Sequence, residues 1–150
     1  MSYQNTNEEG YKNLCVEGTN LWNECIKYRE ELGWNETNLN ELASFISFTY
    51  VYPKSSLLLV DTYNTIHSGV KNFLLVALAL RKINIQPVGI RLDSGDLALI
   101  SKYINLNIRE SRKLFVEIGQ RYNYPEFKNL VISASNDINE NSLNEFNQKV

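Results

Sequence analysis

The order of the apolar segments is the feature that most constrains the fold of this chain. Short apolar runs at residues 57–60, 88–92 and 130–132 are continuous rather than alternating. Continuous runs of this kind are typical of parallel strands that helices cover. Helical stripes follow the first two runs, and Asp137 with Glu140 predicts a last helix after the third. The pattern therefore predicts an α/β fold with at least three consecutive βα units.

Helices are also predicted before these units. A helical stripe that starts after Thr19 ends at Gly33, a residue that favours the left-handed conformation of a helix end. Asn38 and Glu41 have the spacing of a capping box, and the helix that they open ends before Pro53. Residues 1–13 are polar and show no periodicity. We expect a polar tail over 1–13 and one domain over 14–150.

Composition narrows the classes of partner. The chain has 150 residues, of which 43% are hydrophobic and 21% charged, as in a globular domain. A net charge of -2 argues against broad attraction to nucleic acid. The longest apolar run, residues 73–80, is shorter than the ~20 residues that cross a bilayer. Cys15 and Cys25 lack metal-binding spacing, and we expect reduced thiols on a helix in a cytoplasmic protein without a signal peptide.

Polar residues gather where each predicted strand ends. They are Asp61 and Thr62 after the first strand, the stretch from Arg91 to Asp96 after the second, and Ser135, Asn136 and Asp137 after the third. Ligands of parallel α/β sheets bind at the carboxyl ends of the strands. The sequence therefore predicts that these strand ends form one side of an active site.

The stretch GIRLDSGDL carries the strongest charge pattern. Strand alternation places Gly89, Arg91 and Asp93 on one face. If that face points into a barrel, the Arg91 guanidinium is partly desolvated and requires an anion, which is either Asp93 or a substrate carboxylate or phosphate. Ser94 and Gly95 offer a hydroxyl and N–H groups to phosphate or sugar oxygens. The alternative is an ordinary βα turn with a capping aspartate.

His67, the single histidine, is predicted at a helix start. Solvation or capping is one interpretation of its role, and proton transfer or a phosphate contact is the other. The sequence contains no phosphate-binding P-loop, no glycine-rich dinucleotide motif and no zinc-ligand spacing.

Four longer segments carry a family resemblance. In chain order they read ELASFISFTYVYP (41–53), LLVDTYNTIHSGVKNFLLVALAL (58–80), GIRLDSGDLALIS (89–101) and LVISASNDINENSLNEFN (130–147). In this order and spacing they resemble nicotinate phosphoribosyltransferase. The resemblance covers roughly residues 40–150, with a weaker match around Trp22. Separate segments at family spacing are more specific than any one alone.

The resemblance implies an enzyme that joins nicotinate to phosphoribosyl pyrophosphate in NAD salvage, giving nicotinate mononucleotide, with Mg²⁺ and coupled ATP hydrolysis. It also implies a distorted (β/α) barrel of the type II phosphoribosyltransferase kind, a second domain and a homodimer. Arg91 would be catalytic and meet the nicotinate carboxylate or a phosphate, and Asp93 would meet the ribose hydroxyls or Mg²⁺. The residues that would bind substrate are Asp61, Thr62, Ser94, Gly95, Ser135 and Asn136.

This chain departs from the family pattern. Asn64 and His67 stand where the family usually has Asp and Arg, which affects the phosphate contacts expected of that turn. The family's upstream blocks, with a phosphorylated histidine, and its downstream glycine-rich strand ends have no counterpart, and a barrel typically needs ~250 residues. We therefore expect a partial barrel, a fragment that is inactive alone. The alternatives are a non-catalytic module that binds a phosphoribosyl ligand or docks on a complete subunit, and quinolinate phosphoribosyltransferase, which the spacing disfavours.

Overall fold

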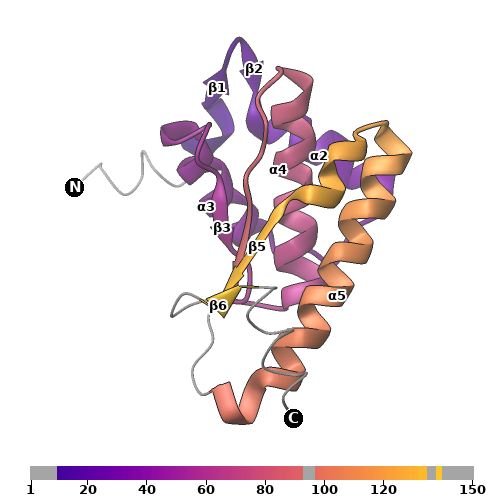
Figure 1. Cartoon of the computed structure of the whole chain (residues 1–150). Helices are drawn as coiled ribbons and strands as arrows, with labels where there is room; N and C mark the ends of the chain where they lie inside the picture. Colours follow the sequence, from indigo (N-terminus) through magenta and orange to yellow (C-terminus); the bar gives the residue numbers. More distant parts are fainter. Residues whose placement is uncertain (1–9, 93–96, 135–137, 140–150) are drawn as a thin grey trace, which may run out of the picture.

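The computed structural model describes residues 10–92, 97–134 and 138–139 of the chain (Figure 1). Its main sheet has the strand order β3 (Leu57–Leu59), β4 (Gly89–Leu92), β5 (Val131–Ala134) and β6 (Ile138–Asn139). Strands β3, β4 and β5 are parallel, and each pair is joined by a helical crossover. The predicted α/β fold with parallel strands is therefore confirmed. The described sheet is open, so the barrel stays a prediction.

Strand β6 corrects one expectation. Its two residues pair antiparallel to β5, with Ala134 opposite Ile138 and Ser133 opposite Asn139. The sequence predicts a helix that opens at Asp137, and this is wrong for Ile138 and Asn139, because the ladder with β5 takes up their backbone groups. The other residues of that predicted helix lie outside the described part of the chain.

The core lies between the sheet and two crossover helices, α4 (Val70–Lys82) and α5 (Leu97–Tyr122). Alternate strand side chains face these helices and are at most 4% exposed: Leu58, Val60, Ile90, Leu92 and Ile132. The rings of Phe73 on α4 and Phe115 on α5 lie 5.7 Å apart. Each fully buried side chain of this size stabilises the fold by about 1.5–3 kcal/mol relative to exposure.

Helix α4 is central, which explains its composition. Apart from Lys71, every residue from Val70 to Leu80 is buried, because the sheet lies on one side of the helix and two further helices pack on the others. These are α2 (Leu21–Leu32) and α3 (Leu39–Val51). A helix that is apolar around its whole circumference is expected in such a place.

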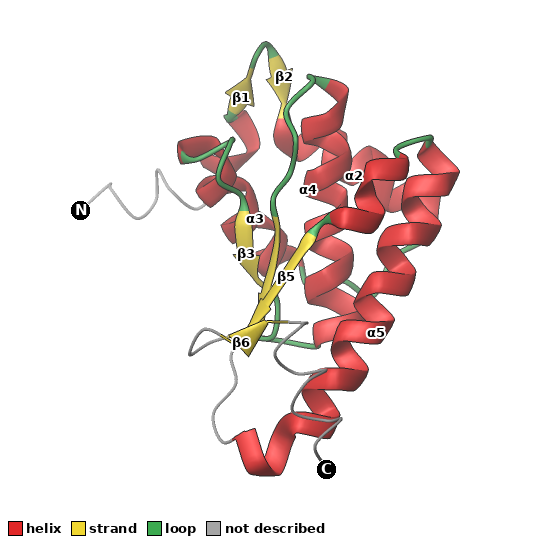
Figure 2. Ribbon diagram, viewed as in Figure 1, coloured by secondary structure: helices red, strands yellow, loops and turns green. Residues whose placement is uncertain are grey.

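The predicted ends of α2 are confirmed with one shift. Gly33 closes the helix with φ 68°, in the left-handed region. The N-cap is Asn20, whose Oδ1 accepts a hydrogen bond from the Asn23 N–H at 2.9 Å. Thr19 does not cap the helix, because it lies in the short hairpin of β1 (Cys15–Val16) and β2 (Thr19–Asn20), which the sequence does not predict. Figure 2 shows this hairpin at the top of the view, with β6 well below it.

The described structure starts at Gly10, within the segment expected to be a polar tail. Residues Tyr11–Asn13 form the 3-10 helix η1, and the Tyr11 ring meets Trp22 edge-on, with centroids 4.8 Å apart. The expected polar tail over 1–13 therefore includes a short helix at its end.

Both cysteines are free thiols. Cys25 is buried in α2, as expected of a thiol packed on a helix, whereas Cys15 is exposed in β1. Within the described residues, no helix combines the length and apolar character needed to cross a bilayer.

Candidate functional site

The carboxyl ends of the parallel strands form the candidate site. Asp61 and Thr62 directly follow the end of β3, where Asp61 is half-buried and Thr62 is exposed. Arg91 lies in β4, in register with Leu59 of β3 and Ser133 of β5. The other predicted site residues lie outside the described residues: Asp93, Ser94, Gly95, Ser135 and Asn136. The structure therefore brings the Asp61 turn and Arg91 to the same edge of one sheet.

Arg91 lies on the face of the sheet that points away from α4 and α5. Its neighbours Ile90 and Leu92 are buried, at 0% and 1% exposure, whereas Arg91 is exposed, so the predicted alternation is confirmed for these residues. The same face carries Leu59, 40% exposed, and Val131, 47% exposed. The predicted desolvation of the guanidinium depends on a closed barrel, and among the described residues Arg91 is exposed.

A groove of about 370 Å³ runs beside Arg91. One wall is α3, with Phe45 and Phe48, and the other is Arg91 with the strand β3. Phe48 is 41% exposed and so offers its ring to a ligand. An apolar groove with one guanidinium in its wall suits a small planar anion, because the ring surface and the charge are met by different side chains. The sequence did not indicate that the two Phe residues lie near Arg91.

The turn after β3 leads into an unusual helix. Thr65–Gly69 form η2, a π-helix, and helices of this type occur frequently at functional sites. The Asn64 Oδ1 accepts a hydrogen bond from the His67 N–H at 3.0 Å. Asn64 therefore caps η2, a position at which Asp and Asn are about equally favourable. The cap contact of His67 uses its backbone, and its side chain is exposed.

Gly69 holds η2 close to the sheet. A Cβ atom at this position would lie 1.8 Å from the carbonyl oxygen of Val60, at the end of β3. Only glycine allows this approach. The contact fixes both ends of the Asp61–Asn64 turn, because Val60 precedes the turn and η2 follows it.

A polar hollow of about 340 Å³ lies between this turn, η2 and α5. Its walls include Tyr63, His67 and Asn107, the last from α5 and only 6% exposed. Sequence reasoning missed Tyr63 and Asn107. Asn107 gives no local signal, since only the packing of α5 against η2 brings it to the turn.

A buried polar cluster joins η2 to α3 and α4. Glu41 Oε1 accepts hydrogen bonds from Ser68 Oγ at 2.7 Å and from Asn72 Nδ2 at 3.1 Å. The predicted capping box is half right: Asn38 Oδ1 accepts from the Glu41 N–H, but the Asn38 N–H donates to Ser68 Oγ rather than to Glu41. Burial raises the pKa of Glu41, and the bonds from Ser68 and Asn72 partly offset this.

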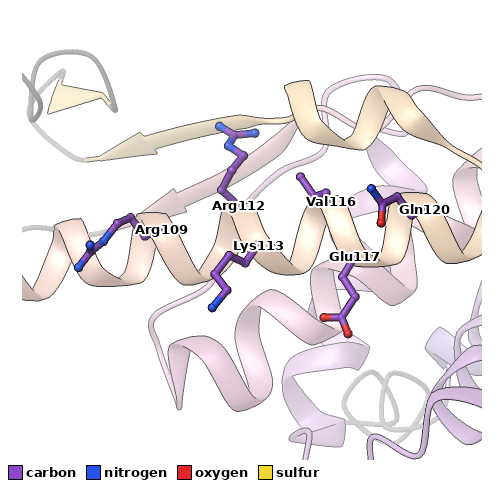
Figure 3. A pocket seen from close by; sticks show the side chains of 6 residues that line it. All are labelled: Arg109, Arg112, Lys113, Val116, Glu117 and Gln120. Carbon is purple, nitrogen blue, oxygen red and sulfur yellow. The ribbon is translucent and has the colours of Figure 1, made fainter.

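A hollow of about 590 Å³ lies elsewhere, on the outer side of α5 (Figure 3). Its described walls are all on α5: Arg109, Arg112, Lys113, Val116, Glu117 and Gln120. The Arg112 guanidinium donates to the carbonyl of Leu130 at 2.6 Å. Since Leu130 directly precedes β5, this hollow lies toward the amino end of that strand and away from the candidate site.

A magnesium site is not assembled by the described residues. Within them, no group of three His, Cys, Asp or Glu side chains could hold a metal ion. The predicted Mg²⁺ contact rests on Asp93, which lies outside the described residues.

Comparisons with known proteins agree on one family. No protein-family model matches the chain. It is 45% identical over 130 residues to nicotinate phosphoribosyltransferase from Dictyostelium discoideum, covering 87% of this chain and 21% of that protein. It is 40% identical over 136 residues to nicotinate phosphoribosyltransferase 2 from Arabidopsis thaliana, covering 89% of this chain and 23% of that protein.

A solved structure extends this likeness to the fold. The crystal structure of human nicotinic acid phosphoribosyltransferase superposes with a TM-score of 0.64 at 32% identity, over 84% of this chain and 25% of that one. The chain thus spans about a fifth to a quarter of the length of the relatives that it matches. Over that length it belongs to the nicotinate phosphoribosyltransferase family.

Proposed function

We propose that this chain supplies one side of a nicotinate phosphoribosyltransferase active site, in which nicotinate and phosphoribosyl pyrophosphate give nicotinate mononucleotide. The observation that carries the proposal is the exposed guanidinium of Arg91 beside the groove of Phe45 and Phe48. Nicotinate is a planar aromatic ring with one carboxylate. The groove suits the ring and Arg91 suits the carboxylate, or alternatively a substrate phosphate.

The reaction sets requirements for the neighbouring strand ends. The pyridine nitrogen forms a bond to the anomeric carbon of ribose, and the bond from that carbon to pyrophosphate breaks, with its electron pair leaving on pyrophosphate. Positive charge therefore develops on the sugar and negative charge on the leaving group. We assign Asp93 to the ribose hydroxyls or Mg²⁺, and Ser94 and Gly95 to the phosphate oxygens.

The remaining predicted contacts follow from strand order. Asp61 and Thr62 end β3, and Ser135 and Asn136 follow β5, so we assign all four to the rim on either side of Arg91. The assignment is supported by the parallel register of the strands, because parallel strands end at the same edge.

The uncovered face of the sheet supports a barrel. Leu59 and Val131 are large apolar residues that are 40% and 47% exposed on the face that also carries Arg91. We propose that further strands close a type II phosphoribosyltransferase barrel around this face, which would bury both side chains and partly desolvate Arg91. By family resemblance we add Mg²⁺, ATP as co-substrate and a homodimer. The free thiols support a reducing compartment such as the cytoplasm.

The test is a segment exchange. The matching segment of the Dictyostelium discoideum relative is replaced by this chain, and nicotinate mononucleotide is measured after addition of nicotinate and phosphoribosyl pyrophosphate. We expect product from nicotinate and none from quinolinate. A folded chimera that makes no product, beside an unmodified relative that does, would refute the proposed function.

A further inference from the structure

Glu41 is an unusual residue in this fold. It is 3% exposed, and among the residues whose side chains the structure describes no other Asp, Glu, Lys or Arg is buried. It lies in the first turn of α3, and its side chain contacts Ser68 of η2 and Asn72 of α4. A carboxylate in such a place is costly unless a cation or several donors meet it.

The cationic side chains of η1, η2 and α4 contact other groups or are exposed. Lys71 of α4 forms an ion pair with Glu36 at 2.8 Å, and the His67 side chain of η2 is exposed. Lys12 of η1 lies 5.9 Å from the ring centres of Tyr11 and Trp22. In the described part of the chain, no Lys, Arg or His lies within ion-pair distance of Glu41.

The cluster has fewer hydrogen-bond donors than acceptors. The Ser68 hydroxyl donates its one proton to Glu41 Oε1, and Asn72 Nδ2 donates to Glu41 Oε1 and to the Asn38 carbonyl. Within this cluster, two buried oxygens then have no hydrogen-bond partner, Glu41 Oε2 and Asn72 Oδ1. Both are acceptors if Glu41 is ionised, so neither can satisfy the other.

We propose that Glu41 is protonated on Oε2 and that Asn72 Oδ1 accepts this proton, which makes a neutral acid–amide pair between α3 and α4. One proton then satisfies both unpaired oxygens and removes the buried charge. The raised pKa of Glu41 supports this state, because its main cause is burial.

The pair also positions η2. Ser68 joins the pair through Glu41 Oε1 and precedes Gly69, which is pressed against Val60 at the end of β3. Glu41 is thus a positioning residue for the turn of Asp61–Asn64, through Ser68. The role of Glu41 in positioning this turn for substrate depends on the proposed function. The protonation of Glu41 does not depend on it, and the tests below address the protonation alone.

The first test is thermal unfolding of the Glu41→Gln variant of this chain. Gln places an NH₂ donor where the proposed Oε2–H lies, so we expect its Tm to equal or exceed that of the wild type. A raised pKa means that the folded state holds its proton, so this stabilisation is present at low pH and is lost as pH rises through the raised value. The Tm advantage of Glu41→Gln should therefore widen as pH rises above the ordinary pKa of a glutamate, about 4.3.

Glu36→Gln is the matched control. Glu36 is exposed, and the bond from Lys71 lowers its pKa, so the effect of pH has the opposite sign. Its stabilisation is present above the ordinary pKa and is lost on acidification, so Glu36→Gln should differ from the wild type at about pH 8 and less at low pH. A Tm for Glu41→Gln that falls below the wild type at every pH would overturn the proposal.

A second test uses the wild type and depends on no variant folding. Infrared spectra of the chain with ¹³C-labelled glutamate at about pH 7 should show the C=O stretch of a protonated carboxyl group, since exposed glutamates are ionised there. Where Glu41→Gln folds, the band should disappear. A spectrum with carboxylate bands only would show that Glu41 is ionised and would overturn the proposal.

Discussion

Leu59 and Arg91 are register partners on adjacent parallel strands, and both side chains lie on the face of the sheet that α4 and α5 do not cover. This face therefore carries a large apolar residue beside a cation. Their pairing fits a surface that other strands cover around a small anionic ligand, which is the arrangement proposed above.

Replacement of Gly69 by Ala should destabilise the chain. The added Cβ atom would overlap the Val60 carbonyl, at 1.8 Å, so either η2 or the end of β3 must move. Overpacking of this kind costs about 1–3 kcal/mol, or more where backbone has to shift. Urea unfolding of Gly69→Ala measures the loss.

Gly10→Ala is the control for that variant. Among the described residues, no atom beyond the chain neighbours of Gly10 lies within 4 Å of a Cβ built there, so the midpoint of unfolding of Gly10→Ala should stay close to that of the wild type. Equal midpoints for the two alanine variants would contradict the close packing of η2 on β3.

The two thiols should differ strongly in reactivity. Burial, and secondarily the nearby Glu24, raises the pKa of Cys25, whereas Cys15 is exposed. Because the thiolate is the reactive form, a disulfide reagent at about pH 8 should modify Cys15 rapidly and Cys25 only on unfolding. Cys15→Ser should remove the fast reaction and Cys25→Ser should keep it. Fast reaction of both thiols in the folded chain would show that α2 is not packed as described.

Alkaline pH should weaken the contact between α2 and α5. The Tyr122 hydroxyl donates to Glu31 Oε1 at 2.9 Å, and burial together with this bond raises the pKa of Tyr122 to about 12. The folded state then retains a proton that an unfolded tyrosine loses near pH ~10. Stability should therefore fall as pH rises from about 10 to about 12, and the Tm difference between wild type and Tyr122→Phe should shrink over this range. A difference that is constant or grows would contradict the hydrogen bond.

The local patterns predicted most of the fold. Continuous apolar runs located the three parallel strands, and helical stripes located α2, α3, α4 and part of α5, since these signals depend on neighbours within a few residues. Gly33 and Asn38 marked helix ends correctly for the same reason. The β1–β2 hairpin and β6 were missed because strands of two residues carry no detectable period.

The site was only partly predictable. The sequence placed Arg91 at a strand end, but whether its face is covered depends on strands beyond those described. Glu41 matched a capping box at the level of spacing. Its actual partners, Ser68 and Asn72, are 27 and 31 residues away along the chain, and no local pattern records a contact at that separation.

The most direct test of the central claim is the steady-state kinetics of Arg91 variants in the segment-exchange chimera. Arg91→Ala should lower kcat/KM for nicotinate on the order of 10²-fold or more. Arg91→Lys should recover only part of this, because an ammonium cannot form the paired bonds of a guanidinium. Arg91 is exposed, so the Tm should change little.

Arg109→Ala is the matched control, since it removes the same charge from the outer side of α5. It should leave kcat/KM unchanged. Near-normal kinetics of the Arg91→Ala chimera would remove Arg91 from the site and contradict the account. A large loss in Arg91→Ala alone, with an unchanged Tm, is the result that the account predicts.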